Sequence, residues 1–338
     1  MKKLLCLCAA LAIGAALPAQ NTTHYWVDPV SGNDTNAGTQ AKPLKTLTKA
    51  TSLLNSDVVV HMLPGVYGPA TNGDFWDATA SKGAKIRLNN HKNFRILGTD
   101  RAKCIIDFKD PSGNDMDNVW YGMIQISGSG TDGVEIAHLT FKNIAVAKAW
   151  GTGPINTTGT CKNVNIHSNY FENTGSTFIC WGGFDVAFHD NVIRSVAPNA
   201  GKYVPIRVRT QYFAAGDGDR PYVYNNTLYD TSQGISYAAP RTHNNVTHQP
   251  TQWICNNIVL KSSGTAFAGN QTNYTSKVNV ENNLTFQCAT DFGYTPSKSN
   301  KINVDPMLSA RYSLEQGTRA FEHAGQAGVL KVLIDNDH

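Results

Sequence analysis

Short segments in which apolar and polar residues alternate recur along the chain, and each places an Asn or an equivalent residue just after the alternation. In "VNIHSNYF" the alternation predicts that Val164 and Ile166 point inward, while Asn165 and His167 point outward. Asn169 then marks a bend before a second apolar run. Similar segments read "VEIAHLTF", "VAFHDNVI", "YVYNNTLY", "WICNNIVL" and "VNVENNLTF". The pattern therefore predicts many short strands joined by bends.

Aligning these segments places five asparagines in one column, with Leu139 in the same column 30 residues before the first. They are Asn169, Asn191, Asn226, Asn257 and Asn283, at intervals of 22, 35, 31 and 26 residues. A constant short core with irregular spacing indicates one coil per segment, with loops of different lengths. The repeat therefore predicts coils of three short strands, which is the unit of a parallel β-helix.

The column of asparagines has a physical explanation in such coils. Asn tolerates left-handed backbone angles, so we expect it at the bend itself. An inward amide can bond to the equivalent amide one coil away, because stacked strands lie about 4.8 Å apart. A buried amide is tolerated only when its hydrogen bonds are made. The alternative, unrelated asparagines in surface turns, is disfavoured by the shared register.

The N-terminal part carries a second pattern, "HYWVDPVSGNDTNAGTQAKPLKTLTKATSLL" followed by "VVVHMLPGVYG". It resembles the opening of secreted bacterial β-helix proteins of the pectate-lyase-like superfamily, including pectate-lyase-related and DUF1565-type proteins. The matching residues are Tyr25, Val27, Gly32, Asp34, Gly38, Thr39, Pro43, Thr46, Ala50, Pro64, Gly65 and Tyr67. The resemblance implies an all-β fold, a single-stranded right-handed parallel β-helix with an N-terminal capping helix.

The capping helix is expected in "LKTLTKATSLL", where one face carries Leu44, Leu47, Ala50 and Leu54. It would cover the open end of the β-helix, whose unpaired strand edges would otherwise aggregate. We expect one domain over residues 20–338, with a cap over about 24–67, coils over about 84–310 and a C-terminal tail over about 311–338.

The first 19 residues predict export. Lys2 and Lys3 precede a short apolar run, and Ala19 offers a small residue for cleavage. We therefore expect a signal peptide over residues 1–19 and a secreted protein, located in the periplasm, outside the cell or on its surface. No other stretch is long and apolar enough to span a membrane.

Charge and cysteines exclude several classes of partner. Removing Lys2 and Lys3 leaves 29 − 2 = 27 basic against 25 acidic residues, a net charge of +2, without any basic run. Nucleic-acid binding is therefore not expected. A weakly positive net charge is compatible with an anionic polysaccharide as the partner. We expect the protein to be a monomer. Of Cys104, Cys161, Cys180, Cys255 and Cys288, a Cys161–Cys180 disulfide is one option and burial as free thiols is the favoured one.

The longest interval, between Asn191 and Asn226, is the best place for inserted function. In "VPIRVR" the side chains of Arg207 and Arg209 share the outer face of a strand, and Lys202 precedes them. Two Arg can neutralise a uronate carboxylate and a Lys can act as base, which a polysaccharide lyase needs. The alternative is an ordinary solvated face.

Neighbouring coils are expected to add substrate-binding residues to this face: Lys148, Trp181, Tyr237 and Arg241. Exposed rings would stack on sugars, and the charges would bind carboxylates. Lys148 is an alternative to Lys202 as the base. Trp is also common in β-helix cores, so each ring has a structural alternative.

Metal and acid–base signals are weaker. Relatives implied by the resemblance use Ca²⁺, and "GDGD" places Asp217 and Asp219 at a spacing that could bind it; Asp115 and Asp117 repeat that spacing. Both pairs can equally be surface-turn residues. His189 and Asp190 precede a ladder Asn and could supply an acid or a base.

The sequence thus leaves two functions open. One is a polysaccharide lyase that cleaves an acidic, uronate-containing polysaccharide by β-elimination. The alternative is a non-catalytic β-helix protein for glycan binding or cell-surface adhesion, which the absence of a dense Asp cluster favours. Epimerase or glycoside hydrolase activity is a third option. Fold alone does not choose between them.

Overall fold

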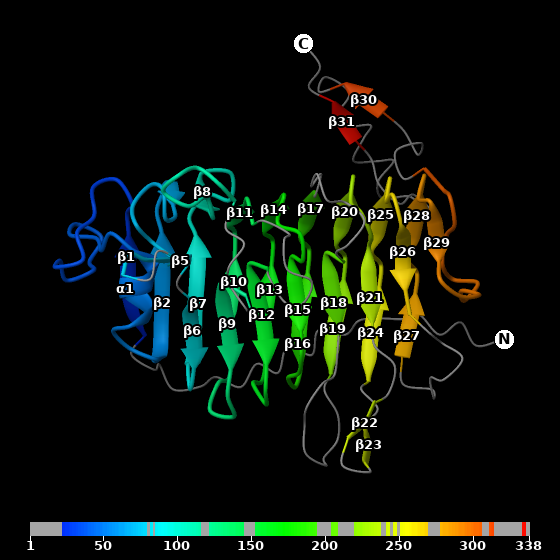
Figure 1. Ribbon diagram of the computed structural model, residues 1–338, viewed down its shortest axis with the longest axis horizontal. Helices are drawn as coiled ribbons and strands as arrows, with labels where there is room; N and C mark the ends of the chain where they lie inside the picture. The colour runs from blue at the N-terminus through cyan, green and yellow to red at the C-terminus, as the bar shows by residue number, and fades with distance from the viewer. Residues whose placement is uncertain are drawn as a thin grey trace.

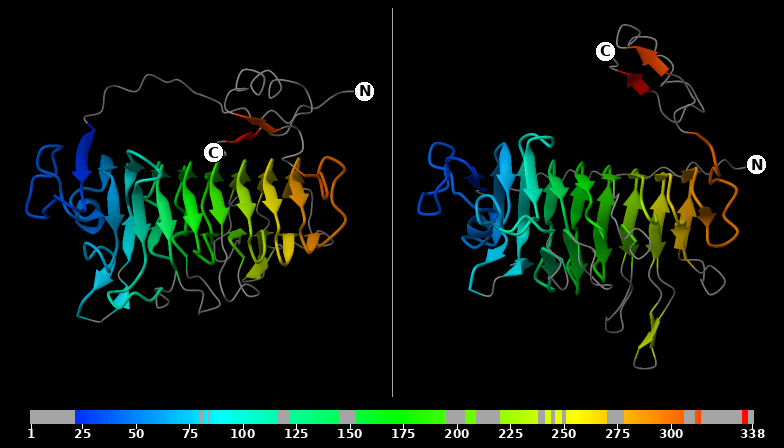
Figure 2. Two further views of the ribbon diagram at one scale, coloured as in Figure 1. Left: turned by 90° about the horizontal axis from the view of Figure 1, so that it is seen from above. Right: turned by 45° about the horizontal axis from the view of Figure 1, so that its top comes forward.

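Three parallel sheets run side by side along the long axis of a computed structural model of the protein (Figures 1 and 2). The structure describes residues 22–79, 82–83, 85–115, 122–144, 153–194, 204–208, 220–237, 241–243, 246–248, 251–269, 278–305, 311–313 and 333–335. The predicted signal peptide lies outside these residues. In the described part of the chain, no helix is long and apolar enough to span a membrane.

Each sheet is built from strands that follow one another at intervals along the chain. The first sheet contains β1 (Thr23–Val27), β2 (Ser56–Met62), β7 (Lys92–Gly98), β10 (Glu135–Ala137), β13 (Asn165–His167), β16 (Val186–His189), β19 (Pro221–Tyr224), β24 (Gln252–Cys255) and β27 (Val278–Glu281). The second contains β3 (Gly65–Tyr67), β8 (Cys104–Asp107), β11 (Thr140–Lys142), β14 (Tyr170–Glu172), β17 (Val192–Arg194), β20 (Thr227–Tyr229), β25 (Ile258–Leu260) and β28 (Leu284–Phe286). The third contains β6 (Ile86–Asn89), β9 (Ile124–Ser127), β12 (Ile155–Thr158), β15 (Phe178–Cys180), β18 (Ile206–Val208), β21 (Ile235–Tyr237), β26 (Thr265–Ala268) and β29 (Thr290–Phe292).

Three short pairs lie apart from these sheets. Strands β4 (Trp76–Asp77) and β5 (Lys82–Gly83) are antiparallel, as are β22 (Arg241–His243) and β23 (Val246–His248). Strands β30 (Arg311–Ser313) and β31 (Leu333–Asp335) are parallel.

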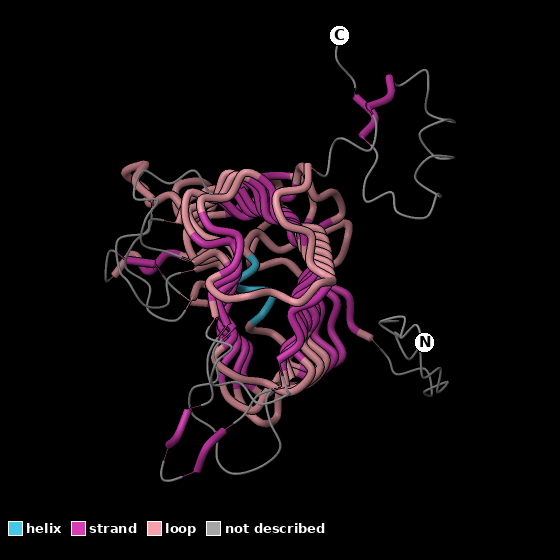
Figure 3. Tube along the Cα trace, turned by 90° about the vertical axis from the view of Figure 1, so that its right-hand side faces the viewer, coloured by secondary structure: helices cyan, strands magenta, loops and turns pink. Residues whose placement is uncertain are grey.

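One coil gives one strand to each sheet, as β13, β14 and β15 do in turn. Equivalent residues of successive coils are paired, so that Ile166 lies opposite Ile136 on one side and Phe188 on the other. Viewed along the axis, the coils superpose on one another (Figure 3). The predicted all-β, single-stranded parallel β-helix is confirmed, and a right-handed path is the one that parallel crossover connections take.

The predicted alternation places the core inside the coil. Val164 and Ile166 are buried, whereas Asn165 and His167 are partly exposed. Buried aromatic side chains stack between coils, with Phe141 and Phe171 ring centroids 4.9 Å apart. This stacking adds a geometry-specific contribution to the burial of apolar area.

The predicted asparagine ladder is confirmed. The side-chain N–H groups of Asn169, Asn191, Asn226 and Asn257 each donate to the Oδ1 of the next Asn at 3.0–3.2 Å. Leu139 begins the column, because its backbone N–H donates to Asn169 Oδ1. The ladder also has a sixth member that the sequence alignment missed.

The sixth member is Asn300, only 17 residues after Asn283, whose side chain donates to it at 3.2 Å. The expected coil of 22 or more residues hid this short interval. Asn300 Nδ2 also donates to the backbone carbonyl of Val280, as earlier members do to the coil before them. The five earlier amides therefore bond to the coils before and after them, whereas Asn300 ends the ladder and bonds to the preceding coil.

The expectation that the ladder asparagines themselves take left-handed angles is wrong by one residue. Positive φ values belong to the preceding residues, for example Ser168 at 56°, Asp190 at 52° and Asn225 at 55°. The preceding residue makes the bend and faces solvent. The ladder Asn that follows can then direct its amide into the coil.

The short helix α1 (Leu47–Thr51) lies at the N-terminal end, against β1, β2 and β6, inside the outline of the coils (Figure 3). Leu44, Leu47 and Ala50 are buried as expected, but Leu54 lies beyond the helix and is 45% exposed. That α1 protects the open end of the β-helix from aggregation stays a prediction. The single domain over residues 20–338 also stays a prediction.

Two buried or partly buried carboxylates hold the segment around α1. Asp34 of the N-terminal pattern accepts hydrogen bonds from the backbone N–H groups of Lys45 and Thr46, both at 2.9 Å. Asp74 is 1% exposed and accepts from the backbone N–H groups of Leu47 and Thr48 in the first turn. Asp34 of the N-terminal pattern and Asp74 therefore both make contacts that stabilise the scaffold.

We expect Asp74→Ala to lower the free energy of unfolding by roughly 3 kcal/mol, because buried N–H donors in the first helical turn lose their acceptor. Urea unfolding followed by circular dichroism measures this loss. Thr48→Val is the matched control, since it removes only the Thr48 hydroxyl bond to Asp74 and should cost about 1 kcal/mol. Equal losses in the two variants would contradict the assignment.

Candidate functional site

Most of the site residues predicted from the sequence lie outside the described residues: Lys148, Lys202, Arg209, Asp217 and Asp219. Arg241 begins β22, and its side chain lies outside the described part of the structure. Their roles as bases, carboxylate-binding groups and Ca²⁺ ligands therefore stay predictions.

The three described members of that site are less exposed than expected. Arg207 lies between buried Ile206 and Val208 on β18, as the alternation predicted, yet it is only 5% exposed. Tyr237 is 3% exposed and belongs to the core, and Trp181 is 8% exposed. The expectation that the rings of Trp181 and Tyr237 are exposed beside Arg207 is therefore corrected. Tyr237 points inward on β21, so its ring lies inside the coil.

The predicted Ca²⁺ ligands Asp217 and Asp219 lie outside the described residues, so this site stays a prediction. Asp115, one of the candidate ligands, forms an ion pair with Lys109 at 2.9 Å, and Asp117 lies outside the described residues. Within the described ranges, no group of three potential ligands from His, Cys, Asp and Glu gathers. We therefore derive no chemical step through Ca²⁺.

Four of the five expected mature cysteines are buried, and Cys288 is partly exposed. Cys161 and Cys180 both approach the backbone carbonyl of Gly182, at 3.9 and 3.8 Å. The favoured reading of these residues as small buried side chains agrees with this arrangement.

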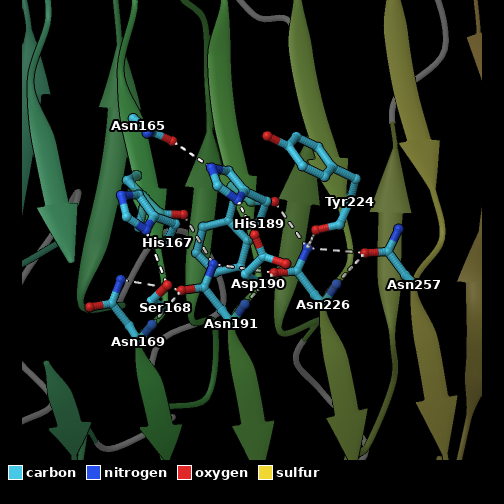
Figure 4. Close-up of polar contacts among 12 residues, drawn as sticks. Asn165, His167, Ser168, Asn169, His189, Asp190, Asn191, Tyr224, Asn226 and Asn257 are labelled. Atoms are coloured by element: carbon cyan, nitrogen blue, oxygen red, sulfur yellow. Dashed lines mark hydrogen bonds and ion pairs between the residues drawn. The ribbon is translucent and has the colours of Figure 1, made fainter. Parts of the chain in front are cut away.

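A group of titratable side chains instead gathers on the outer face of the first sheet (Figure 4). We call it the histidine face, and it comprises Glu135, Asn165, His167, His189, Asp190 and Tyr224. The strands β13, β16 and β19 place His167, His189 and Tyr224 directly opposite one another. Their rings stack, with centroids 5.0 Å apart between the two imidazoles and 4.5 Å between His189 and Tyr224.

His189 is held at both ring nitrogens. Its Nδ1 lies 2.6 Å from Asp190 Oδ2, and its Nε2 lies 2.7 Å from Asn165 Oδ1. Asp190 takes the left-handed conformation that directs its carboxylate outward beside the ring. The imidazole is therefore oriented by a carboxylate on one side and an amide on the other, as an acid–base group requires.

His167 is held by a second carboxylate. Its Nε2 lies 3.1 Å from Glu135 Oε1, and its Nδ1 lies 3.1 Å from Ser168 Oγ. The guanidinium of Arg95 donates from Nε to the other oxygen of Glu135 at 2.5 Å. Each imidazole of the stack thus has a carboxylate of its own.

The electrostatic environment shifts two of these groups. The hydrogen bond from His167 and the charge of Arg95 lower the pKa of Glu135 to about 2, against the opposing effect of partial burial. Burial lowers the pKa of His189 below its usual value, although Asp190 opposes this effect. Glu135 is therefore ionised and His189 is mostly neutral near pH 7.

Further aromatic side chains lie along the same face. Trp26 stacks on His61 with centroids 4.8 Å apart, and Tyr222 stacks on Trp253 at 4.7 Å. The register places Tyr222 on the same strand as Tyr224 and Trp253 on the next. These rings extend the histidine face along the axis of the coil.

Sequence reasoning found His189 and Asp190 but treated them as an isolated pair. The signal that it missed is the position two residues before each ladder residue. His167, His189 and Tyr224 all hold that position, before Asn169, Asn191 and Asn226 respectively. The ladder register therefore places the three side chains in line.

A family described as proteins of unknown function (DUF1565) matches residues 30–200. The chain belongs to this family. The match covers half of the chain and includes Glu135, His167 and His189, whereas Tyr224 lies beyond it. The DUF1565 description carries no activity, so the family assignment leaves the chemistry of the histidine face open.

Solved structures give distant likenesses to this DUF1565 protein. A rhamnogalacturonan lyase is 15% identical with a TM-score of 0.40, covering 80% of this chain and 70% of that one. A pectin methylesterase in complex with a hexasaccharide is 12% identical with a TM-score of 0.37, covering 92% and 97%. A tailspike protein of E. coli bacteriophage HK620 in complex with a pentasaccharide is 14% identical with a TM-score of 0.38, covering 82% and 51%. No curated protein matches the sequence.

Proposed function

We propose that the protein acts on an acidic, uronate-containing polysaccharide and cleaves it by β-elimination at the histidine face. The observation that carries this proposal is the Asp190–His189–Asn165 arrangement, in which a mostly neutral imidazole is held beside a hydroxyl-bearing ring. Such an imidazole can remove a weakly acidic proton near neutral pH. The sugar-bound complexes among the solved structures are compatible with a glycan substrate.

His189 is our candidate for the base. With Nδ1–H donating to Asp190, the lone pair of Nε2 faces the amide of Asn165. That amide can turn about its Cβ–Cγ bond and present either its oxygen or its N–H group. It therefore fits both the neutral and the protonated ring, and its N–H group can also bind the uronate carboxylate.

The proposed step is balanced by groups of this face. The C5–H bond of the uronate breaks and its proton goes to His189 Nε2, while the electron pair forms the C4=C5 double bond. The C4–O4 bond breaks, and the leaving oxygen takes a proton from the hydroxyl of Tyr224. Once the product has left, the imidazolium of His189 releases its proton to solvent and the phenolate of Tyr224 takes one up from solvent, which restores both groups.

The test is a scan of purified protein against pectate, alginate and glycosaminoglycans, with unsaturated uronate detected by its ultraviolet absorbance. We expect product from one polymer class, unchanged by EDTA because no step uses a metal. Absence of unsaturated product from every uronate polymer would overturn the lyase proposal. Product that disappears with EDTA and returns with Ca²⁺ would support the Ca²⁺ prediction at Asp217 and Asp219.

A second candidate function is glycan binding without cleavage. It is favoured by the aromatic pairs Trp26–His61 and Tyr222–Trp253 on the outer face of the first sheet, since rings of this kind contact sugars. Quenching or enhancement of tryptophan fluorescence by a polysaccharide that is not cleaved would select this alternative.

The Arg207-centred site remains a separate proposal. Arg207 belongs to the third sheet and His189 to the first, so the two sites lie on different faces of the coil. Neutralisation of the uronate by Arg207 and Arg209, with Lys202 or Lys148 as base, predicts loss of product in Arg207→Gln with His189 intact.

A further inference from the structure

Two imidazoles of the histidine face lie too close together to be charged independently. The rings of His167 and His189 are nearly parallel, with an interplanar angle of 11° and centroids 5.0 Å apart. Their side chains are only 19% and 14% exposed. At this separation in a partly buried setting, repulsion between two positive rings changes a proton-binding constant on the order of a hundredfold.

We propose that His167 and His189 cannot both hold a proton, and that His167 is a positioning residue that keeps His189 uncharged. This inference rests on the proposed role of His189 as a base and adds how its charge state is set. The stack, its two carboxylates and the surrounding charges carry it.

The groups around the stack differ on its two sides. His167 faces Glu135 and His138 from the β10 segment, with Arg95 beyond Glu135 on β7. His189 faces Asn165 from β13, Tyr224 from β19 and its own neighbour Asp190. Ser168 completes the contacts of His167.

These contacts direct the one proton that the pair can hold to His167. Glu135 stays ionised because its pKa is about 2, and its Oε1 lies against His167 Nε2. The positive charge on His167 then lowers the pKa of His189, in the same direction as burial. Interacting groups of this kind bind protons in steps that belong to the pair. A neutral His189 is the form that can accept a proton from substrate.

The test follows the imidazole signals of His189 by NMR as a function of pH, in protein labelled at histidine. In His167→Gln we expect the His189 midpoint to rise by about two pH units, a change on the order of a hundredfold, because the repulsion from the His167 ring is gone. Glu135→Gln, which leaves both rings in place, should raise it in the same direction. His138→Asn is the matched control, since His138 contacts only the edge of His167 at 5.9 Å, and it should move the midpoint much less.

An unchanged or lowered His189 midpoint in both His167→Gln and Glu135→Gln would overturn the inference. The readout does not depend on turnover. A raised midpoint in a protein that cleaves no polymer would keep the repulsion between the two rings and reject the lyase, whereas cleavage with an unchanged midpoint would keep the lyase and reject the repulsion.

Discussion

His189→Gln is expected to lower the rate of unsaturated product formation by roughly 10²–10⁴-fold, the usual contribution of a positioned acid–base group. Gln can still hydrogen-bond to Asn165 but cannot take up a proton at neutral pH. The side chain lies on the outer face of β16, so the core beneath it stays intact. Product formation is followed by ultraviolet absorbance, and folding by circular dichroism and urea unfolding.

Arg207→Gln is the matched variant for this experiment, because it removes the charged side chain that is described in the alternative site on the third sheet. We expect the His189 variant to lose far more product than the Arg207 variant does. Retention of most activity in His189→Gln, together with loss in Arg207→Gln, would move the reaction to the third sheet.

Asn226→Leu is expected to lower the free energy of unfolding by roughly 4 kcal/mol. Asn226 is fully buried, and its amide bonds to Asn191, Asn257 and the backbone carbonyl of Phe188. Leu139 shows that a Leu fits this column of the coil, so the loss is of hydrogen bonds more than of volume. Several buried donors and acceptors are left unpaired, each costing about 1–3 kcal/mol.

The control for this prediction is Asn300→Leu at the end of the ladder. Asn300 accepts from Asn283 on one side and is 7% exposed, so fewer buried groups lose a partner. We expect roughly half the cost of Asn226→Leu, measured by urea unfolding. A cost at Asn300 equal to or larger than that at Asn226 would mean that the interior ladder bonds contribute little.

The fold could be predicted because its main signal is periodic. The period of two around Val164 and Ile166 defines the inward face, and the repeated Asn column defines the stacking of coils. The residue with left-handed backbone angles lies one position before the ladder Asn, where the sequence pattern did not predict it. Both positions are often Asn, as in Asn225–Asn226 and Asn256–Asn257. The tolerance of Asn for left-handed angles does not distinguish the bend position from the ladder position. The direction of the side chain does, because the bend residue faces solvent and the ladder residue points into the coil.

The candidate site was predictable only in part. His189 and Asp190 are adjacent in sequence and were noticed, but Glu135, His167 and Tyr224 come from other coils. Only register brings them together, and the ladder supplies that register. Tyr237 alternates with the buried Ile235 on β21, so the period of two already places its ring inside the coil. Trp181 follows the end of β15, where alternation no longer defines the direction of the side chain.

Substrate binding at the histidine face is tested most directly by a crystal structure of the His189→Gln variant, which prevents turnover. The crystal should contain an oligosaccharide of the polymer that the scan identifies. We expect a uronate ring over the outer face of the first sheet, with its C5 facing residue 189 and its carboxylate or ring oxygens in contact with Asn165 or Tyr224. A sugar bound instead on the third sheet beside Arg207, with the histidine face empty, would contradict it.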